Sequence, residues 1–385
     1  MIKSIIFVIT SMEAGTGGHF YSLSTTAKIL QSKFNVYIVQ LGKTLSPVIK
    51  HSGINYSHLY TNFINQKEVT TELTDICKQV KPDIIHAFDW RSYILCFDAA
   101  RRLNLHLALT KCGGPVRRDY PEVNNLVVFT KEDLDFYQTK VNLSKTQLVF
   151  IPNRVQPFVC DQQRMSLLNS VLNLNGRRVI LRIGRISSAY YETIVQSINM
   201  ARDLHKYDQT FSLVLIGNIE SELLFKQIMN DIADCDFIHV VSDKTFTLNA
   251  KTLINIAEIV VGTGRGFMEA CCMNKIMMAP NKGQRYPVLV THDNFNDIFY
   301  YNFSERYGSQ DNLTAIELLK RINEYQDDSS LWFDQYFSTS PLESLYSSFY
   351  DNLKPTLYNN LLWSVRWKLI RLKLKNFLKK ILDMI

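Results

Sequence analysis

The sequence predicts an α/β protein with two Rossmann-like domains in series and an amphipathic helix at the C-terminus. Apolar segments of strand length, rich in β-branched residues, alternate with segments of helical periodicity. This alternation restarts near residue 170, and glycine-rich turns follow several of the strand-like segments. The length of 385 residues also exceeds one ordinary hydrophobic core, so two domains are expected.

The first half begins with a buried strand over residues 3–11, which a glycine turn joins to a helical segment. A second strand covers residues 34–42. The helical segment VTTELTDICKQV then precedes the strand PDIIHAF, and three more strand-like segments follow: LHLALTKCGG, NNLVVFTK and TQLVFIPNRV. Strands that alternate with helices indicate a parallel sheet covered on both faces.

The second half repeats this pattern. RRVILRIGRI is a strand, YYETIVQSINMARDL a helix and FSLVLIGNI a strand, and the alternation continues to FMEACCMNKIMMAP. We therefore expect a first domain over residues 1–160, a second over 170–335, and a C-terminal region over 336–385. The polar stretch 156–176 is predicted to be the linker, and residues 300–345 carry no decisive pattern.

Charge and cysteine usage favour a cytosolic protein with one basic segment. Residues 363–385 hold seven basic residues and one acid, so +6 of the net charge of +7 lies there. The seven cysteines have neither CxxC nor zinc spacing, which indicates reduced thiols. The N-terminus has no cleavage site typical of a signal peptide, and no apolar run approaches the ~20 residues of a membrane span.

Glycine-rich turns indicate where a ligand binds. In open α/β sheets, ligands lie beyond the carboxyl ends of strands, where helix N-termini point free N–H groups. Such turns occur at predicted strand ends in both halves, which favours a cleft between two facing domains. Each turn alone is better explained by the conformational freedom of glycine in tight turns. The glycines concerned are Gly15, Gly17, Gly18, Gly113, Gly114, Gly184, Gly262, Gly264 and Gly266.

The residues at these turns favour a nucleoside diphosphate over a dinucleotide. Neither GTGGHF nor GTGRGF has the third glycine of the dinucleotide fingerprint, and the second strand ends without an acid. Arg182 and Arg185 end a strand, and Arg265 follows the second glycine turn; the guanidinium fork suits a diphosphate. Glu269 is suited to accept two ribose hydroxyls. A strand-end ion pair for Arg182 and helix-dipole compensation for Glu269 remain as alternatives.

These stretches resemble the retaining GT-B glycosyltransferases of the glycogen-synthase and mannosyltransferase-like group. The resemblance rests on the order and spacing, between residues 13 and 280, of GTGGHF, PDIIHAFDW, LTKCGGP, VFIPNRV, RIGRIS and VGTGRGFMEA. It implies a nucleotide-sugar donor in the second domain, a glycan acceptor against the first, and no cofactor or metal. It also implies that Arg185 binds the donor phosphates, that Glu269 binds the ribose, and that Gly17 and Gly18 lie against donor or acceptor.

The sequence departs from the family pattern at three positions. The first glutamate of the E-x7-E motif is Val261, the lysine after the GR pair is Tyr190, and the turn histidine is Cys112. Other cations are candidates to replace the lysine, and backbone amides at the second glycine turn are candidates to replace the glutamate. The candidate cations are Arg182, Arg265 and Lys111, and the candidate amides run from Gly264 to Met268.

The predicted site therefore has three parts. His86 and Asp89 follow a strand, so both are expected to face the cleft, although a structural hydrogen bond explains His86 equally well. The predicted catalytic residues are His86, Arg185 and Glu269. The predicted donor-binding residues are Gly17, Gly18, Arg182, Arg185, Gly264, Arg265, Gly266, Phe267, Met268 and Glu269. The predicted acceptor-facing residues are Asp89, Lys111, Cys112, Gly113 and Gly114.

The C-terminal segment is predicted to be a helix that lies in the plane of an anionic membrane. Its apolar residues recur in steps of three and four, and cations flank them. The alternative is a terminal helix packed on the protein; nucleic acid is disfavoured because no aromatic stacking platform accompanies the charge. The apolar stripe comprises Trp363, Trp367, Ile370, Leu374, Phe377, Ile381 and Ile385, and the membrane-facing set is Trp363, Trp367, Lys368, Arg371 and Lys375.

Together these features predict a membrane-peripheral glycosyltransferase on the cytoplasmic face of the cell membrane. It would transfer a sugar from a nucleotide-sugar, with retention, to a glycan acceptor that is lipid-linked, in bacterial-type surface polysaccharide synthesis. Two other functions remain open: a sugar-nucleotide epimerase of the same fold, and a non-catalytic subunit that binds glycan or nucleotide.

Overall fold

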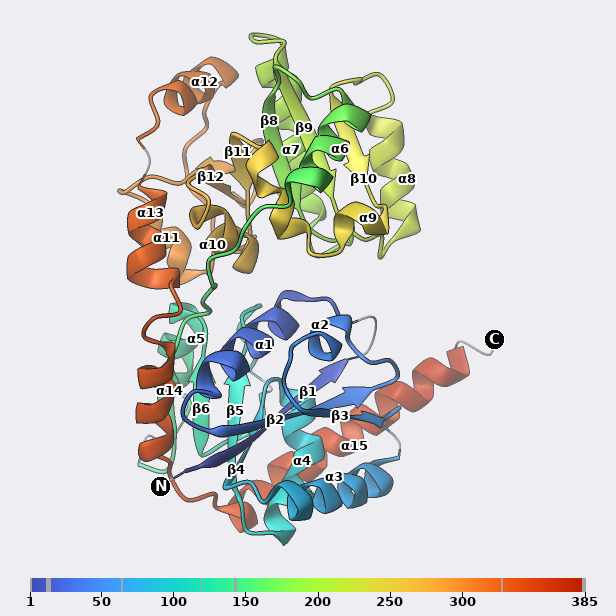
Figure 1. The fold of residues 1–385 in the computed structure, drawn as a ribbon, viewed down its shortest axis with the longest axis vertical. Helices are drawn as coiled ribbons and strands as arrows, with labels where there is room; N and C mark the ends of the chain where they lie inside the picture. The colour runs from blue at the N-terminus through green and yellow to red at the C-terminus, as the bar shows by residue number, and fades with distance from the viewer. Residues whose placement is uncertain are drawn as a thin grey trace. The chain divides into compact units, whose positions relative to one another are not determined.

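The computed structural model contains two compact units, each built on one sheet (Figure 1). The first unit joins Met1–Arg154 to Thr339–Ile385, and the second is Val155–Ser338. The prediction of two Rossmann-like α/β domains with a C-terminal helix is confirmed. The residues that the structure describes are 2–11, 15–63, 65–118, 120–141, 144–326 and 328–382, with side chains in the last helix described as far as residue 374.

The first unit contains a seven-stranded parallel sheet in the order β3-β2-β1-β4-β5-β6-β7. Every residue of β1 is buried, because helices cover both faces of the sheet. The strands are β1 (Ser4–Ser11), β2 (Asn35–Gly42), β3 (Tyr56–Tyr60), β4 (Ile84–Ala87), β5 (His106–Lys111), β6 (Asn125–Val128) and β7 (Gln147–Phe150).

Successive strand residues point to opposite faces, so each strand contributes to two hydrophobic cores. Helices α1 and α14 cover the core that contains Ile5 and Phe7, whereas α3, α4 and α15 cover the core that contains Ile6 and Val8. The helices are α1 (Gly18–Leu30), α2 (Pro47–Lys50), α3 (Gln66–Val80), α4 (Trp90–Arg102), α5 (Lys131–Gln138), α14 (Leu342–Asp351) and α15 (Tyr358–Leu382).

The second unit contains a six-stranded sheet in the order β10-β9-β8-β11-β12-β13, parallel except for β13. Its strands are β8 (Arg178–Ile183), β9 (Phe211–Ile216), β10 (Ile238–Val241), β11 (Ile259–Val261), β12 (Ile276–Ala279) and β13 (Val288–Leu289). Its helices are α6 (Gln162–Leu172), α7 (Tyr191–His205), α8 (Glu222–Asp231), α9 (Lys244–Thr247), the 3₁₀ helix η1 (Ala250–Ile256), α10 (Arg265–Cys271), α11 (Phe295–Tyr300), α12 (Ala315–Asn323), α13 (Ser329–Trp332) and the π-helix η2 (Phe333–Phe337).

The predicted linker over residues 156–176 is wrong. Most of this stretch forms α6, whose first turn is capped by the Asp161 side chain. Arg164 then ties α6 to the second unit, since its guanidinium donates to the carbonyl oxygens of Thr245, Phe246 and Leu248. The polar composition that suggested a linker reflects a half-exposed surface helix. The boundary between the units accordingly falls after Arg154, earlier than the predicted residue 160.

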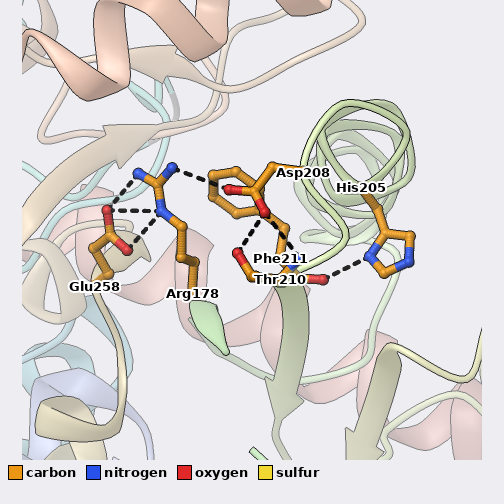
Figure 2. A network of polar contacts seen from close by, with 6 residues as sticks. All are labelled: Arg178, His205, Asp208, Thr210, Phe211 and Glu258. Carbon is orange, nitrogen blue, oxygen red and sulfur yellow. Dashed lines mark hydrogen bonds and ion pairs between the residues drawn. The ribbon is translucent and has the colours of Figure 1, made fainter. Parts of the chain in front are cut away.

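A network of polar contacts fixes the amino edge of the second sheet (Figure 2). Arg178, the first residue of β8, donates three bonds of 2.6, 3.0 and 3.3 Å to the Glu258 carboxylate and one of 3.4 Å to Asp208. Its guanidinium also lies 4.4 Å from the ring centroid of Phe211. Because these residues stand at or just before the starts of β8, β9 and β11, one arginine holds three neighbouring strands together.

Candidate functional site

At the carboxyl edge of the second sheet, the loops after β8 and β9 are bonded to each other. The Gly184 amide donates to the Ile216 carbonyl at 2.9 Å, and the Ile186 amide donates to the Asn218 carbonyl at 2.9 Å. A Cβ at Gly217 would lie 1.7 Å from the Gly184 carbonyl oxygen, so only glycine permits this approach. The backbone that follows β8 is therefore fixed in position.

The glycine turn after β11 serves packing. A Cβ at Gly262 would lie 2.7 Å from the Phe267 Cα atom, so this glycine lets α10 pack against its own strand. Gly264 has a φ of +48° and donates its amide to the Asn302 carbonyl at 3.1 Å. The Phe267 ring stacks on Phe303, with 3.6 Å between the ring centroids.

Arg182 is a buried cation at the end of β8. Its exposed fraction is 2 %, and its Nη1 donates to the Ile183 carbonyl at 2.8 Å. Among the described residues its Nε and Nη2 atoms have no hydrogen-bond partner. Burial lowers the pKa of this guanidinium, and the nearby Glu305 carboxylate opposes that shift. A buried guanidinium with two unbonded nitrogens is costly, and an anionic ligand that reached it would offset that cost.

Arg185 lies on the loop that follows β8 and is already paired. Its Nη1 donates to the Glu220 carboxylate at 2.8 Å, and about half of the side chain is exposed. Tyr190, at the start of α7, contacts both arginines: its ring centroid lies 5.7 Å from the Arg182 guanidinium and 5.3 Å from that of Arg185. Tyr190 therefore does not leave a gap in the site, because its ring lies close to both guanidinium groups.

Arg265 and Glu269 bind each other. The Arg265 Nε donates to the Glu269 carboxylate at 2.8 Å, one turn along α10, and both side chains are largely buried. Val261 stands where the E-x7-E motif has its first glutamate, and it is a fully buried strand residue. Glu269 can meet a ribose only by sharing its carboxylate with Arg265 or by releasing that residue.

The predicted use of the backbone amides from Gly264 to Met268 is largely contradicted. Three of these amides already donate within the chain, from Gly264 to Asn302, from Gly266 to Thr263 and from Met268 to Gly264. The Phe267 and Met268 side chains are fully buried. Phe267 and Met268 therefore support the turn through packing.

One residue that the sequence did not predict, Glu305, lies near Arg182. Glu305 accepts a hydrogen bond from the Thr193 hydroxyl at 2.9 Å, which brings the segment after α11 to the start of α7. In the described part of the chain, the Asn302 Oδ1 and Ser187 Oγ atoms are buried without a hydrogen-bond partner. Nothing in the local sequence marks Asn302 or Glu305, because their role depends on contacts with distant segments.

The prediction of His86 as a catalytic residue is contradicted. The side chain is fully buried in the first unit, and its two ring nitrogens lie 2.8 Å from the Tyr350 hydroxyl and the Thr110 hydroxyl. Burial lowers the pKa of His86 to about 3. His86 is therefore a neutral core residue that joins the sheet to α14.

Asp89 and Lys111 are also structural. Asp89 caps α4 and accepts hydrogen bonds from the amide and hydroxyl of Thr10, so it ties the end of β1 to that helix. Lys111 is buried and forms an ion pair of 2.8 Å with Asp133. Its ammonium group also donates to the Gly113 and Gly114 carbonyl oxygens. Lys111 therefore cannot replace a missing phosphate-binding cation.

The remaining predicted residues of the first unit lie at strand ends or helix starts. Gly17 precedes α1 and Gly18 begins it. Gly113 and Gly114 have positive φ values and follow β5. The Cys112 thiol donates to the Phe88 carbonyl at 3.3 Å, and burial raises its pKa, so it is protonated. At the carboxyl edge of the first sheet, Gly18 and Gly114 are exposed and Gly17 and Gly113 are partly exposed.

Metal clusters and membrane-spanning helices are both absent from the described residues. No group of three or more His, Cys, Asp or Glu side chains there is arranged to hold a metal ion. No helix in that part of the chain combines the length and the apolar character needed to cross a membrane.

Solved structures with the same fold include transferases and epimerases. Alr3699/HepE from Anabaena, solved in complex with UDP, matches with a TM-score of 0.65 and 12% identity, over 91% of this chain and 100% of that one. A glycosyltransferase from Rickettsia africae matches with a TM-score of 0.59 and 15% identity, over 97% and 98%. A UDP-GlcNAc 2-epimerase from Neisseria meningitidis, bound to UDP-GlcNAc, matches with a TM-score of 0.55 and 12% identity, over 90% and 99%.

At these identities the similarity shows the fold alone, which is the GT-B fold of these proteins. No protein-family model and no curated protein sequence matches the chain.

Proposed function

We propose that this protein is a retaining glycosyltransferase that transfers a hexosyl group from a nucleotide-sugar to a lipid-linked glycan. The proposal rests first on Arg182, whose buried guanidinium has two nitrogens without a hydrogen-bond partner among the described residues. Diphosphate oxygens would supply those partners and neutralise the charge. The neighbours solved with UDP or UDP-GlcNAc support a nucleotide-sugar as the ligand.

Other residues at the carboxyl edge have secondary roles in this proposal. Arg185 exchanges Glu220 for the donor phosphates, and Glu269 accepts the ribose hydroxyls. As the glycosidic bond to the donor breaks, negative charge grows on the leaving diphosphate, and fixed guanidinium groups stabilise that charge. Because arginines supply the positive charge, we propose that the reaction needs neither a metal ion nor a cofactor.

The proposed acceptor and location come from the C-terminal helix. Trp363 and Trp367 of α15 are exposed to solvent, and basic residues adjoin them. Such a helix suits an enzyme that works peripherally at the cytoplasmic face of the membrane, on a lipid-linked acceptor for surface polysaccharide.

Nucleotide release from a panel of sugar nucleotides, with and without lipid-linked acceptor, tests the proposal. The expected result is acceptor-dependent release of a nucleoside diphosphate, unchanged by EDTA and lowered at least about 100-fold in Arg182→Met. Retention is checked by NMR of the anomeric carbon in the product. Formation of an epimeric sugar without transfer would instead identify an epimerase. Tight nucleotide binding with no turnover of any donor would identify a binding subunit.

A further inference from the structure

Helix α15 carries two apolar stripes. The inner stripe packs into the core of the first unit, where α15 contacts α4 (Figure 1). Its side chains are less than a tenth exposed, and they are Tyr358, Leu361, Val365, Leu369 and Leu372. The sequence alternatives of a packed helix and a surface helix are therefore not exclusive, because packing uses residues outside the stripe that the sequence suggested.

The outer stripe is exposed. The exposed fractions are 84 % for Trp363, 61 % for Trp367, 50 % for Ile370 and 55 % for Leu374. At 3.6 residues per turn, the centres of the two stripes lie about 170° apart around the helix axis. The helix is thus held to the protein by one face while an apolar face of two tryptophans and two aliphatic residues points away.

Cations lie on both sides of the outer stripe. Arg366 and Lys373 fall on one side and Arg371 on the other, each within about 90° of the stripe centre. Arg366 and Arg371 are exposed. Over its whole length, Tyr358–Leu382, the helix has seven basic residues and no acidic residue. Lys375, Lys379 and Lys380 belong to this count, although their side chains lie outside the described residues.

We propose that the outer face of α15 docks on the surface of an anionic lipid bilayer, with the helix axis in the membrane plane. Tryptophan rings suit the interface between headgroups and acyl chains, and flanking arginines suit lipid phosphates. A second copy of the chain fits less well, since two such helices would bring like charges together. The inference deepens the proposed membrane location and rests on that part of the proposed function, independently of the transferase activity.

Because α15 packs with one face and exposes the other, only some variants of this helix test the docking proposal. Deleting residues 363–385 would remove inner-stripe residues together with the outer ones, so loss of fold and loss of docking would coincide. Substitutions on the outer face avoid this, because those side chains make no core contact. Val365→Ser, on the inner stripe, provides the contrast: it should lower Tm, whereas Trp363→Ser with Trp367→Ser should leave Tm unchanged.

Flotation of the full-length chain with vesicles tests the proposal. The chain should bind phosphatidylcholine vesicles containing about 30 mol % phosphatidylglycerol at least about 10-fold more strongly than vesicles of phosphatidylcholine alone, and about 0.5 M NaCl should weaken that binding. Trp363→Ser with Trp367→Ser, and separately Arg366→Gln with Arg371→Gln, should each weaken it about 10-fold or more. The matched control is Val159→Ser with Leu331→Ser, which removes two exposed apolar residues of the second unit and should change nothing.

Several results would overturn the proposal. The first is equal binding to vesicles with and without phosphatidylglycerol. The second is wild-type vesicle binding by the tryptophan variant. The third is a dimer, seen in sedimentation, that dissociates when the two tryptophans are substituted. Nucleotide release with a soluble acceptor, measured on the same variants, separates the two proposals. If the chain does not bind vesicles but still releases nucleotide, the docking proposal is wrong and the transferase proposal is kept. If it binds vesicles but releases no nucleotide, only the docking proposal is kept.

Discussion

Two arginines on strand β8, four residues apart, have opposite surroundings. Arg178, at the amino edge, donates to two carboxylates and lies over the ring of Phe211 (Figure 2). Arg182, at the carboxyl edge, is more deeply buried, yet two of its nitrogens have no partner among the described residues. Both side chains lie on the same face of the strand, because residues i and i+4 do so in any β-strand.

The difference separates a structural cation from a binding cation. Contacts with Glu258 and Asp208 raise the pKa of Arg178, so folding itself satisfies that charge. For Arg182 the largest effect on the pKa is burial, which lowers it, so folding leaves that charge to be satisfied by something else. A protein that keeps such a group accepts a cost in stability, which is typical of a site that binds an anion.

The largest expected effect comes from Arg182→Met, which keeps the length of the side chain and removes its charge. Turnover of the nucleotide-sugar should fall at least about 100-fold, the scale for losing one fixed charge at a developing anion. Tm should stay the same or rise, since an uncompensated buried cation is removed. Steady-state kinetics and thermal unfolding check the two parts. Wild-type turnover in the variant would show that the diphosphate does not bind at Arg182.

Arg178→Met should reverse this pattern. Loss of the paired guanidinium leaves Glu258 and Asp208 without their partner, so the free energy of unfolding should fall by about 2 kcal/mol. The affinity for the proposed nucleotide ligand, probed with UDP, should not change. Urea unfolding and calorimetric titration measure the two quantities. Arg177→Met, one residue earlier on the surface, is the matched control and should change stability by no more than about 0.5 kcal/mol. A loss of UDP affinity in Arg178→Met would remove the contrast between the two edges.

The fold could be predicted because buried parallel strands are continuous apolar runs, such as IIFVI in β1 and VIL in β8. The positions of Arg182 and Arg185 at the end of a strand could be predicted in the same way. The partners of the arginines on and after β8 could not, because Glu258 and Glu220 reach Arg178 and Arg185 from 80 and 35 residues away. Sequence spacing therefore identifies candidate cations, and only three-dimensional contacts show which one lacks a partner.

His86 and α15 show the same limit. The Tyr350 partner of His86 is 264 residues away, so the local pattern HAFDW could not distinguish a core histidine from one facing a ligand. In α15 the sequence stripe through Trp363 and Trp367 was conspicuous, but Leu361, Val365 and Leu369 supply a second stripe on the same helix. Which stripe packs depends on the shape of the first unit, and the helical pattern alone does not contain that information.

His86 should behave like Arg178, as a structural group, and the pH dependence of stability tests this. Its folded-state pKa of about 3 lies below the ordinary value of 6.5, so between these values only the unfolded chain binds the proton. The contribution of His86 to the free energy of unfolding is therefore fully present above about pH 6.5. Between about pH 6.5 and pH 3 it falls by up to about 1.4 kcal/mol for each pH unit. Urea unfolding at about pH 7 and pH 5.5 measures the slope.

The substitution His86→Gln should flatten this slope, whereas His51→Gln on the surface should keep it. A small residual slope is expected from His239, whose pKa burial also lowers. A wild-type slope in His86→Gln would mean that another group carries the pH dependence, and His86 would then no longer be assigned as a neutral core residue.

The smallest expected effect concerns Arg185. It is intermediate between Arg178 and Arg182, because its partner Glu220 is half-buried and can be exchanged for a ligand. If the donor phosphates take Arg185 from Glu220, binding must break an ion pair worth at most about 1 kcal/mol. Glu220→Gln should then tighten UDP binding by up to about 5-fold.

The control is Glu222→Gln, which removes the same charge from an exposed residue in the first turn of α8 and should have less effect. Calorimetric titration with UDP measures both. Weaker binding in Glu220→Gln would mean that Glu220 positions Arg185 for the phosphates, and equal binding in both variants would place Arg185, like Arg178, among the structural cations.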